Sequence, residues 1–257
     1  DPLLERRLVE RDGEALRLAP STRDAIARGA LSASELAKAH LLAAAWFALL
    51  EPERGGGKRA AQVVHHLVLG GDVARAEALF SSESLALRAG PRQVGRLLRP
   101  LADASKNAET LLNLSDMLLD LSQPRAAVRA AARATRYGNG PQLRRRAALV
   151  ASDALTRLGR PARAELLLGG FWAAGGQAVR GPDGAEVLQR LARARLARGD
   201  YAGAKSTAEQ ALAEAPSAMV AGLLHETLGV AHAYLGEAEQ AEQALNRSLS
   251  LLGDQAR

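Results

Sequence analysis

The feature that most constrains the fold of this chain is an internal repeat. Residues 185–217 hold a helical spacing of apolar residues, a break at Gly199, a second helical run with small residues such as Ala204, and a closing Pro216. The next copy has its break at Gly236. Glycine adopts the left-handed backbone of a tight turn without a side-chain clash, and alanine lets two helices cross closely. Each copy is therefore predicted to be an antiparallel helix pair.

Earlier copies are weaker but follow the same plan. The predicted turns fall at Ser122, Gly159, Gly199 and Gly236, which are 37, 40 and 37 residues apart. A degenerate fifth copy turns at Gly71, 51 residues before Ser122, and residues 91–104 can supply about one extra helix that Pro100 kinks or ends. Residues 175–184, with four glycines and a proline, are predicted to be an exposed loop.

The length and landmarks of these units resemble the tetratricopeptide repeat (TPR), whose ideal period is about 34 residues. The resemblance implies an all-α fold, a right-handed TPR-like α-solenoid of about five helix pairs. Stacked repeats bury their apolar faces against their neighbours and leave an extended concave surface for binding. We expect four TPR-like repeats in residues 106–257 and degenerate helical repeats in residues 31–105.

The opening residues differ from the repeats. Residues 3–11 are predicted to form a helix, Asp12 and Gly13 a turn, and residues 15–18 a short strand, as in the tail of a winged-helix domain spanning residues 1–30. The residues that carry a further resemblance are Leu8-Val9-Glu10, Leu16-Arg17-Leu18, Pro20, His40, Trp46, His65-His66, Gly71-Asp72 and Ala76. Together they resemble the junction between winged helix and superhelix in STAND-type signalling ATPases, especially the maltose-regulator-like group. Ala19 departs from that group, which usually has a histidine before the proline.

That resemblance implies that a nucleotide-binding domain precedes this segment and that the superhelix is the sensor and autoinhibitory arm of a bacterial regulator. The chain begins at Asp1 without a methionine or a charged-then-apolar leader, which indicates an excised fragment or a processed product. The resemblance implies a cytoplasmic location. Its longest apolar run, residues 41–50, is about half of what a membrane span needs. The absence of cysteine excludes disulfides, thiolate zinc sites and cysteine nucleophiles.

The sequence contains few residue patterns that are typical of nucleotide binding, metal binding or catalysis. Gly55-Gly56-Gly57-Lys58 lacks the first glycine and the hydroxyl of a phosphate loop, so a flexible loop is predicted. His225 and His232 lie on one helix face but at packing positions, where a partly buried structural role is expected; His40 is interpreted as isolated. We therefore expect no enzyme activity, metal or cofactor.

The predicted function is binding of a protein or peptide on the concave face. By the phase of the repeats, the inward-facing residues are His65, Asp116, Asp120, Arg146, Asp153, Arg157, Gln189, Arg193, Glu226 and Tyr234. Asp116, Asp153 and Arg193 are predicted to form a row that a partner contacts. The alternative is a regulator that contacts nucleic acid through its arginine-rich surface, because the net charge is +6.

Overall fold

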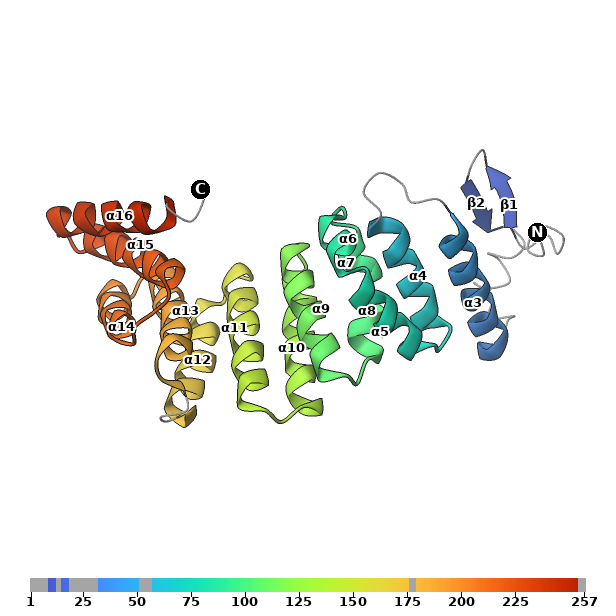
Figure 1. Cartoon of the computed structure of the whole chain (residues 1–257), viewed down its shortest axis with the longest axis horizontal. Helices are drawn as coiled ribbons and strands as arrows, with labels where there is room; N and C mark the ends of the chain where they lie inside the picture. Colours follow the sequence, from blue (N-terminus) through green and yellow to red (C-terminus); the bar gives the residue numbers. More distant parts are fainter. Residues whose placement is uncertain (1–8, 13–14, 19–31, 51–56, 176–178, 254–257) are drawn as a thin grey trace.

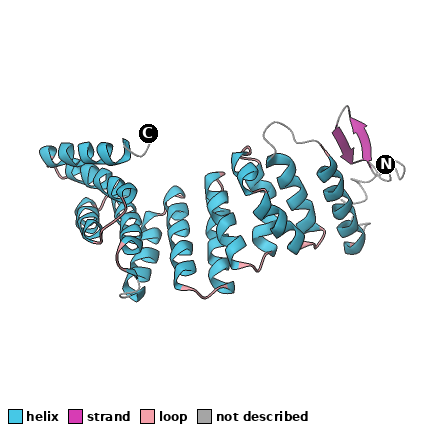
Figure 2. Ribbon diagram, viewed as in Figure 1, coloured by secondary structure: helices cyan, strands magenta, loops and turns pink. Residues whose placement is uncertain are grey.

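The computed structural model describes residues 9–12, 15–18, 32–50, 57–175 and 179–253. These form an extended row of helices with one small hairpin at its N-terminal end (Figures 1 and 2). The prediction of a helical solenoid is confirmed in its main architecture, whereas the right-handed sense and the division of the chain at residues 30 and 105 stay predictions.

Five antiparallel helix pairs make up most of the row, and each pair is the unit that the repeat predicted. The pairs are α4 (Gly57–Leu69) with α5 (Val73–Ser82), α9 (Ala108–Asp120) with α10 (Pro124–Tyr137), α11 (Pro141–Arg157) with α12 (Pro161–Gly175), α13 (Pro182–Arg198) with α14 (Tyr201–Ala213), and α15 (Ala218–Tyr234) with α16 (Ala238–Gly253).

All five predicted turns have the backbone that the sequence indicated. Gly71, Gly159, Gly199 and Gly236 have φ between +69° and +85°, and Ser122 takes φ +59° in their place. At each turn the next amide donates to a carbonyl five residues back, and the turn amide donates to the carbonyl three residues back. This double hydrogen bond is the Schellman ending of a helix, and it fixes the reversal between partners.

Three short helices stand between α5 and α9, where the sequence predicted about one extra helix that Pro100 kinks or ends. They are α6 (Ser84–Ala89), α7 (Val94–Leu97) and α8 (Arg99–Ala104). Pro100 lies in the first turn of α8, where its missing N–H has no partner to lose. Pro100 therefore starts a helix rather than kinking one.

Small side chains hold the pairs together, as the repeat predicted. Ala127, Ala164, Ala204 and Ala208 are fully buried, and the buried Ser115 hydroxyl donates to the Ala127 carbonyl across a crossing at 2.8 Å. The buried apolar residues form two clusters, one extending from Ala44 to Ala154 and the other from Ala148 to Ala244. Both clusters include residues of α11, so this helix joins the two halves of the row.

The N-terminal end agrees with the sequence in part. β1 (Val9–Asp12) pairs antiparallel with β2 (Ala15–Leu18), with Val9 opposite Leu18. The strand at residues 15–18 is confirmed, but residues 9–11 are a strand and not the end of the predicted helix, because they pair with β2. The remainder of the winged-helix prediction, residues 1–8 and 19–30, lies outside the described residues. α3 (Ala33–Leu49) follows, with Ser32 and Glu35 forming a reciprocal capping box at its start.

The described part of residues 175–184, which is residue 175 and residues 179–184, is not the exposed loop that the glycines indicated. Val179 is buried, and residues 182–184 form the first turn of α13. The Arg180 guanidinium lies over the Trp172 ring and pairs with Glu214 at 2.7 Å, while the Gly181 amide donates to the same carboxylate at 2.8 Å. These contacts tie the second half of the segment to α12 and α14. Residues 176–178 lie outside the described residues.

None of the helices in the described ranges is long and apolar enough to cross a membrane.

Candidate protein-interaction surface

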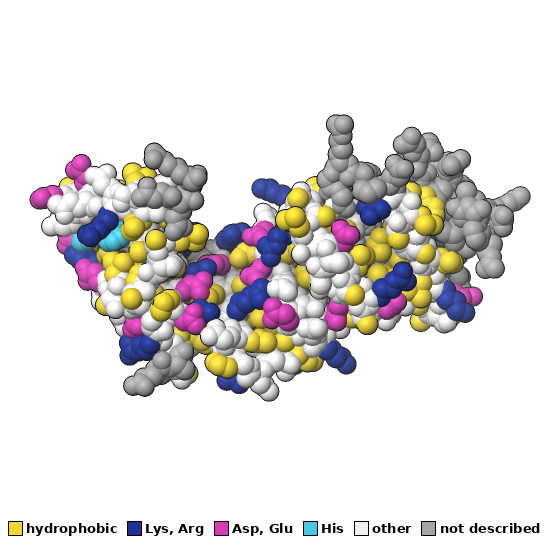
Figure 3. Space-filling model, in the orientation of Figure 1, with side chains coloured by type: hydrophobic (Ala, Val, Ile, Leu, Met, Phe, Trp, Pro, Cys, Tyr) yellow, Lys and Arg dark blue, Asp and Glu magenta, His cyan; other side chains and the backbone are white. Residues whose placement is uncertain are grey.

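The first helices of successive pairs, α9, α11, α13 and α15, contact one another in order and form a continuous wall, which we call the A-helix face. Side chains of both signs gather over the middle of the row (Figure 3). All predicted binding residues except His65 lie on these four helices. The structure divides them into a group with charged partners inside the chain and a group without.

Arg146 is the centre of the first network. Its guanidinium contacts Asp116 at 2.6 Å, Asn113 at 2.7 Å and Glu109 at 2.8 Å, all on α9. Burial lowers the pKa of Arg146, but hydrogen bonds and charge from Asp116 and Glu109 outweigh it and raise that pKa overall. Asp116 and Arg146 therefore hold α9 to α11.

A second network joins α11 to α13. The Asp153 carboxylate accepts from Arg190 at 3.2 Å, and Arg190 also donates to Gln189 at 3.2 Å. Gln189 is only 3% exposed, so it offers no surface to a partner. The predicted row of Asp116, Asp153 and Arg193 is therefore not uniformly open, because intrachain ion pairs engage its first two members.

Two further predicted residues lie at the turn between α9 and α10. Asp120 forms an ion pair with Arg88 of α6, and the Arg157 guanidinium donates to the Leu119 carbonyl at 2.8 Å. Both side chains stay exposed. The sequence placed them on the same concave face as Asp116, but their contacts lie at the turn between α9 and α10.

The C-terminal part of the A-helix face is open. Arg193 and Glu226 are exposed, and no charged partner is found for either among the described residues. Tyr234 is 66% exposed and stacks on Tyr201, with ring centroids 4.3 Å apart and planes at 1°. On α15, Val230 stands between Glu226 and Tyr234 in the sequence and is half-buried. We call Arg193, Glu226, Val230 and Tyr234 the open end.

The histidines form a cluster that sequence reasoning missed. His40 of α3 is not isolated, since its Nδ1 lies 2.9 Å from Nδ1 of His66 on α4, and the Phe47 ring stacks on His66. Burial, followed by the charges of His40 and His65, lowers the pKa of His66 to about 4. His65 lies on α4, outside the four helices of the A-helix face, and its Nδ1 contacts the Leu97 carbonyl at 3.0 Å.

The other histidines have structural surroundings. His225 and His232 are half-buried, as predicted, and His232 pairs with Glu237 beside Lys205. In the described ranges no group of three or more His, Cys, Asp or Glu side chains is arranged to hold a metal ion.

The glycine-rich segment before α4 has a packing role at its end. Gly57 is buried in the first turn of α4, and a Cβ there would lie 2.2 Å from the Ala86 carbonyl oxygen. Lys58 follows it in the helix, so the predicted flexible loop does not include residues 57 and 58. Residues 55 and 56 lie outside the described residues.

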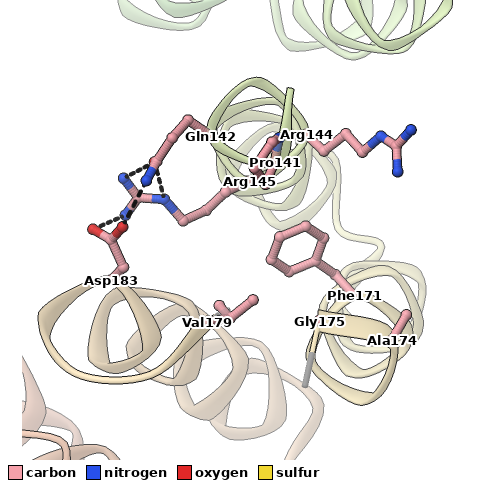
Figure 4. A pocket seen from close by; sticks show the side chains of 9 residues that line it. All are labelled: Pro141, Gln142, Arg144, Arg145, Phe171, Ala174, Gly175, Val179 and Asp183. Atoms are coloured by element: carbon pink, nitrogen blue, oxygen red, sulfur yellow. Dashed lines mark hydrogen bonds and ion pairs between the residues drawn. The ribbon is translucent and has the colours of Figure 1, made fainter. Parts of the chain in front are cut away.

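One pocket of about 360 Å³ lies where α11, α12 and α13 meet (Figure 4). Phe171 and Val179 line its apolar side, while Arg145 on its rim is engaged by Gln142 and by Asp183 at 2.7 Å. Arg144 points away from the pocket. The polar groups that converge here thus bind one another, and the pocket lacks a set of free polar groups for orienting a ligand.

The chain matches no known protein-family profile, and no curated protein sequence is similar to it. The solved structures that are similar to it include the following two. BtubC (BKLC) from P. vanneervenii is 14% identical, with a TM-score of 0.50 over 88% of this chain and 93% of that one. MamA is 16% identical, with a TM-score of 0.47 over 80% of this chain and 99% of that one. At such identity the likeness to BtubC indicates the fold alone, a TPR-like helical solenoid.

Proposed function

We propose that this protein is a binding module that holds an extended segment of a partner protein against the open end of its A-helix face and carries no catalysis of its own. The observation that supports this is the contrast along one face. Asp116 and Asp153 are engaged by arginines of the next repeat, whereas Arg193, Glu226 and Tyr234 are exposed and have no charged partner among the residues that the structure describes.

The open end has the chemistry of a peptide site. Arginine and tyrosine are the residue types that dominate binding energy at protein interfaces, because each combines a broad apolar surface with directional donors. Arg193 can pair with a carboxylate, Tyr234 can pack on an apolar or aromatic side chain, and Glu226 can accept from a backbone or basic group. The preferred ligand is an extended segment with an acidic residue close to an apolar one.

The cellular setting that we propose is the sensor arm of a bacterial STAND-type signalling ATPase. The β1–β2 hairpin ahead of the helical row supports it, because a wing precedes the superhelix in the family that this sequence resembles. In this setting, partner binding at the open end would be transmitted along the row to domains that precede it.

A peptide selection tests the binding proposal even though the partner is unidentified. A random peptide library is panned on the immobilised protein, and the affinities of enriched peptides are measured by fluorescence anisotropy. Arg193→Glu with Tyr234→Ala should weaken binding by about tenfold or more, since anchor residues cost more than about 1 kcal/mol when truncated.

The matched control combines Arg163→Glu with Tyr137→Ala, because both side chains are exposed on the second helices α12 and α10. This control should bind like the wild type. Equal affinity of both double variants, or no enrichment at all, would remove the open end as the site.

A further inference from the structure

The second surface of interest is the turn between α9 and α10, where arginines of three other helices make contacts. Arg88 of α6 pairs with Asp120, Arg99 of α8 donates to the Gln123 side-chain oxygen, and Arg157 of α11 donates to the Leu119 carbonyl. Figure 1 shows α6, α7 and α8 beside α9 and α10. The turn is therefore contacted by cationic groups on several sides.

Two more arginines extend this group. Arg96 follows Gly95 on α7, whose backbone approaches so closely that a Cβ there would lie 2.7 Å from Cγ of Gln123. Arg125 is the second residue of α10 and is exposed. We call Arg88, Arg96, Arg99, Arg125 and Arg157 the basic edge; all five are exposed.

The charge of the basic edge is poorly balanced. Asp120 is the one acid that the structure pairs with these five arginines among the described residues. The next acid along the chain is Asp153, and the segment between the two contains seven arginines and no Asp or Glu. Arg99 and Arg157 contact neutral oxygens, which leaves each guanidinium its charge and several of its five N–H donors.

We propose that the basic edge docks an acidic segment of a partner protein, whose Asp and Glu carboxylates pair with these guanidinium groups. Arginine is suited to this role because its planar fork matches a carboxylate with two parallel hydrogen bonds. The five residues of the edge include no aromatic ring, and stacked rings are what single-stranded nucleic acids use for much of their binding energy. A protein carboxylate cluster is therefore favoured over nucleic acid.

This surface is separate from the open end. Its residues lie at the turn edge near α6 to α10, whereas Arg193, Glu226 and Tyr234 lie on α13 and α15. The two proposals can therefore fail independently, and variants of one should leave binding at the other unchanged.

The test uses two labelled probes of matched charge, an octaglutamate peptide and an eight-phosphate single-stranded oligonucleotide, titrated at 150 mM salt. The variant replaces Arg96, Arg99 and Arg125 with glutamine. The control makes the same change at Arg75, Arg136 and Arg144, which are exposed and lie away from the turn. Both variants lose the same net charge, so the control measures diffuse attraction, and melting temperatures are recorded for both.

We expect the peptide to bind the wild type and the control similarly and the test variant about tenfold more weakly, since several exposed charge pairs act together. Three results would overturn the proposal: no peptide binding by the wild type, equal weakening in both variants, or tighter binding of the oligonucleotide than of the peptide. The last would assign the edge to nucleic acid. If the test variant melts early, single Arg→Gln changes at the same positions replace it; weaker peptide binding by a single variant that melts like the wild type supports the proposal, and full binding by all three overturns it.

Discussion

The middle and the C-terminal end of the A-helix face use the same repeat position in opposite ways. Asp116, Asp153 and Arg193 each stand six residues before the turn residue of their pair. Asp116 and Asp153 form ion pairs with the following repeat at 2.6 and 3.2 Å, whereas Arg193 is exposed and forms no ion pair within the described part of the chain. Position within a repeat therefore does not decide whether a residue stabilises the solenoid or is available to a partner.

The residues of the following repeat decide whether a residue at this position forms an ion pair within the chain. Asp116 meets Arg146, which stands thirteen positions before the turn at Gly159, and Asp153 meets Arg190, nine positions before the turn at Gly199. The residues of α15 at those two places are Leu223 and Thr227, and neither can form an ion pair with a guanidinium. The series of ion pairs ends at Arg193 because α15 has no acid at either of these two positions.

The largest expected effect concerns what both regions share, the close helix crossings. Ala204→Leu adds three heavy atoms at a fully buried site and should lower the free energy of unfolding by about 1–3 kcal/mol. Urea unfolding followed by circular dichroism measures the change. Ala202→Leu on the exposed face of the same helix is the control and should change stability by less than about 0.5 kcal/mol. Similar losses in both variants would show that the crossing at Ala204 is not tightly packed.

The next effect separates the two regions. Arg146→Ala breaks contacts with Asp116, Glu109 and Asn113 and leaves a partly buried carboxylate, so it should cost about 1–2 kcal/mol of unfolding free energy. Arg193→Ala should cost less than about 0.5 kcal/mol, because no partner is lost. The same urea titration compares them. Equal costs would contradict the division of the face into a paired middle and an open end.

The pairing of Asp116 and Asp153 also limits what a triple substitution of the predicted row could test. If Asp116, Asp153 and Arg193 only formed a surface for a partner, replacing all three would weaken binding and leave folding nearly intact. In the structure two of the three residues join helices, so a loss of binding by that variant would not distinguish contact from stability.

The turns explain why the fold was predictable and the pairings were not. Each turn is encoded in a short consecutive segment, as in Gly199-Asp200, whose aspartate also caps α14. The five turns could therefore be located from the sequence, including Ser122, where no glycine marks the positive φ. Asp116 and Arg146 belong to different repeats and are far apart in the sequence, and their contact depends on how much neighbouring pairs rotate against each other. No local pattern records that rotation.

The same limit applies to the His40–His66 contact, which joins two distant positions of the sequence across α3 and α4. The nearest sequence signal is the phase of both helices, which places each histidine on the apolar side.

A smaller effect concerns the far end of the row, where α3 packs mainly against α4. Burial lowers the pKa of His66 from 6.5 to about 4, and that of His40 is also lowered, so docking of α3 favours neutral rings. The stabilisation is complete above about pH 6.5 and is lost as the pH falls toward 4, because the undocked rings bind protons first. His65 is the other titratable group that contacts the pair.

Hydrogen exchange of the α3 amides, corrected for intrinsic rates, should therefore be faster at pH 4.5 than at pH 7.5. His66→Gln should reduce this pH dependence, whereas His225→Gln, a change at a half-buried histidine of α15, should leave it intact. A pH-independent protection of α3 in the wild type would show that the histidine pair does not govern its docking.

The smallest expected effect comes from adding one more ion pair to the series formed by Asp116–Arg146 and Asp153–Arg190. Leu223 stands thirteen positions before the turn residue Gly236, just as Arg146 stands thirteen positions before Gly159. Leu223→Glu therefore puts an acid at the repeat position from which Arg146 reaches the preceding first helix. The long side chain of Arg193 on α13 then pairs with this acid. The new pair should contribute about 0.2–1 kcal/mol, roughly offset by the lost burial of a half-buried leucine, so the net stability should change little. A double-mutant cycle with Arg193→Ala isolates the pair and should give a coupling energy in that same range.

The Leu223→Glu variant should at the same time bind the selected peptides about as weakly as Arg193→Ala does, because the guanidinium of Arg193 is now engaged within the chain. A coupling energy near zero together with unchanged peptide affinity would mean that α13 and α15 do not bring Arg193 and residue 223 together. The series of ion pairs would then end for a geometric reason and not because an acid is missing.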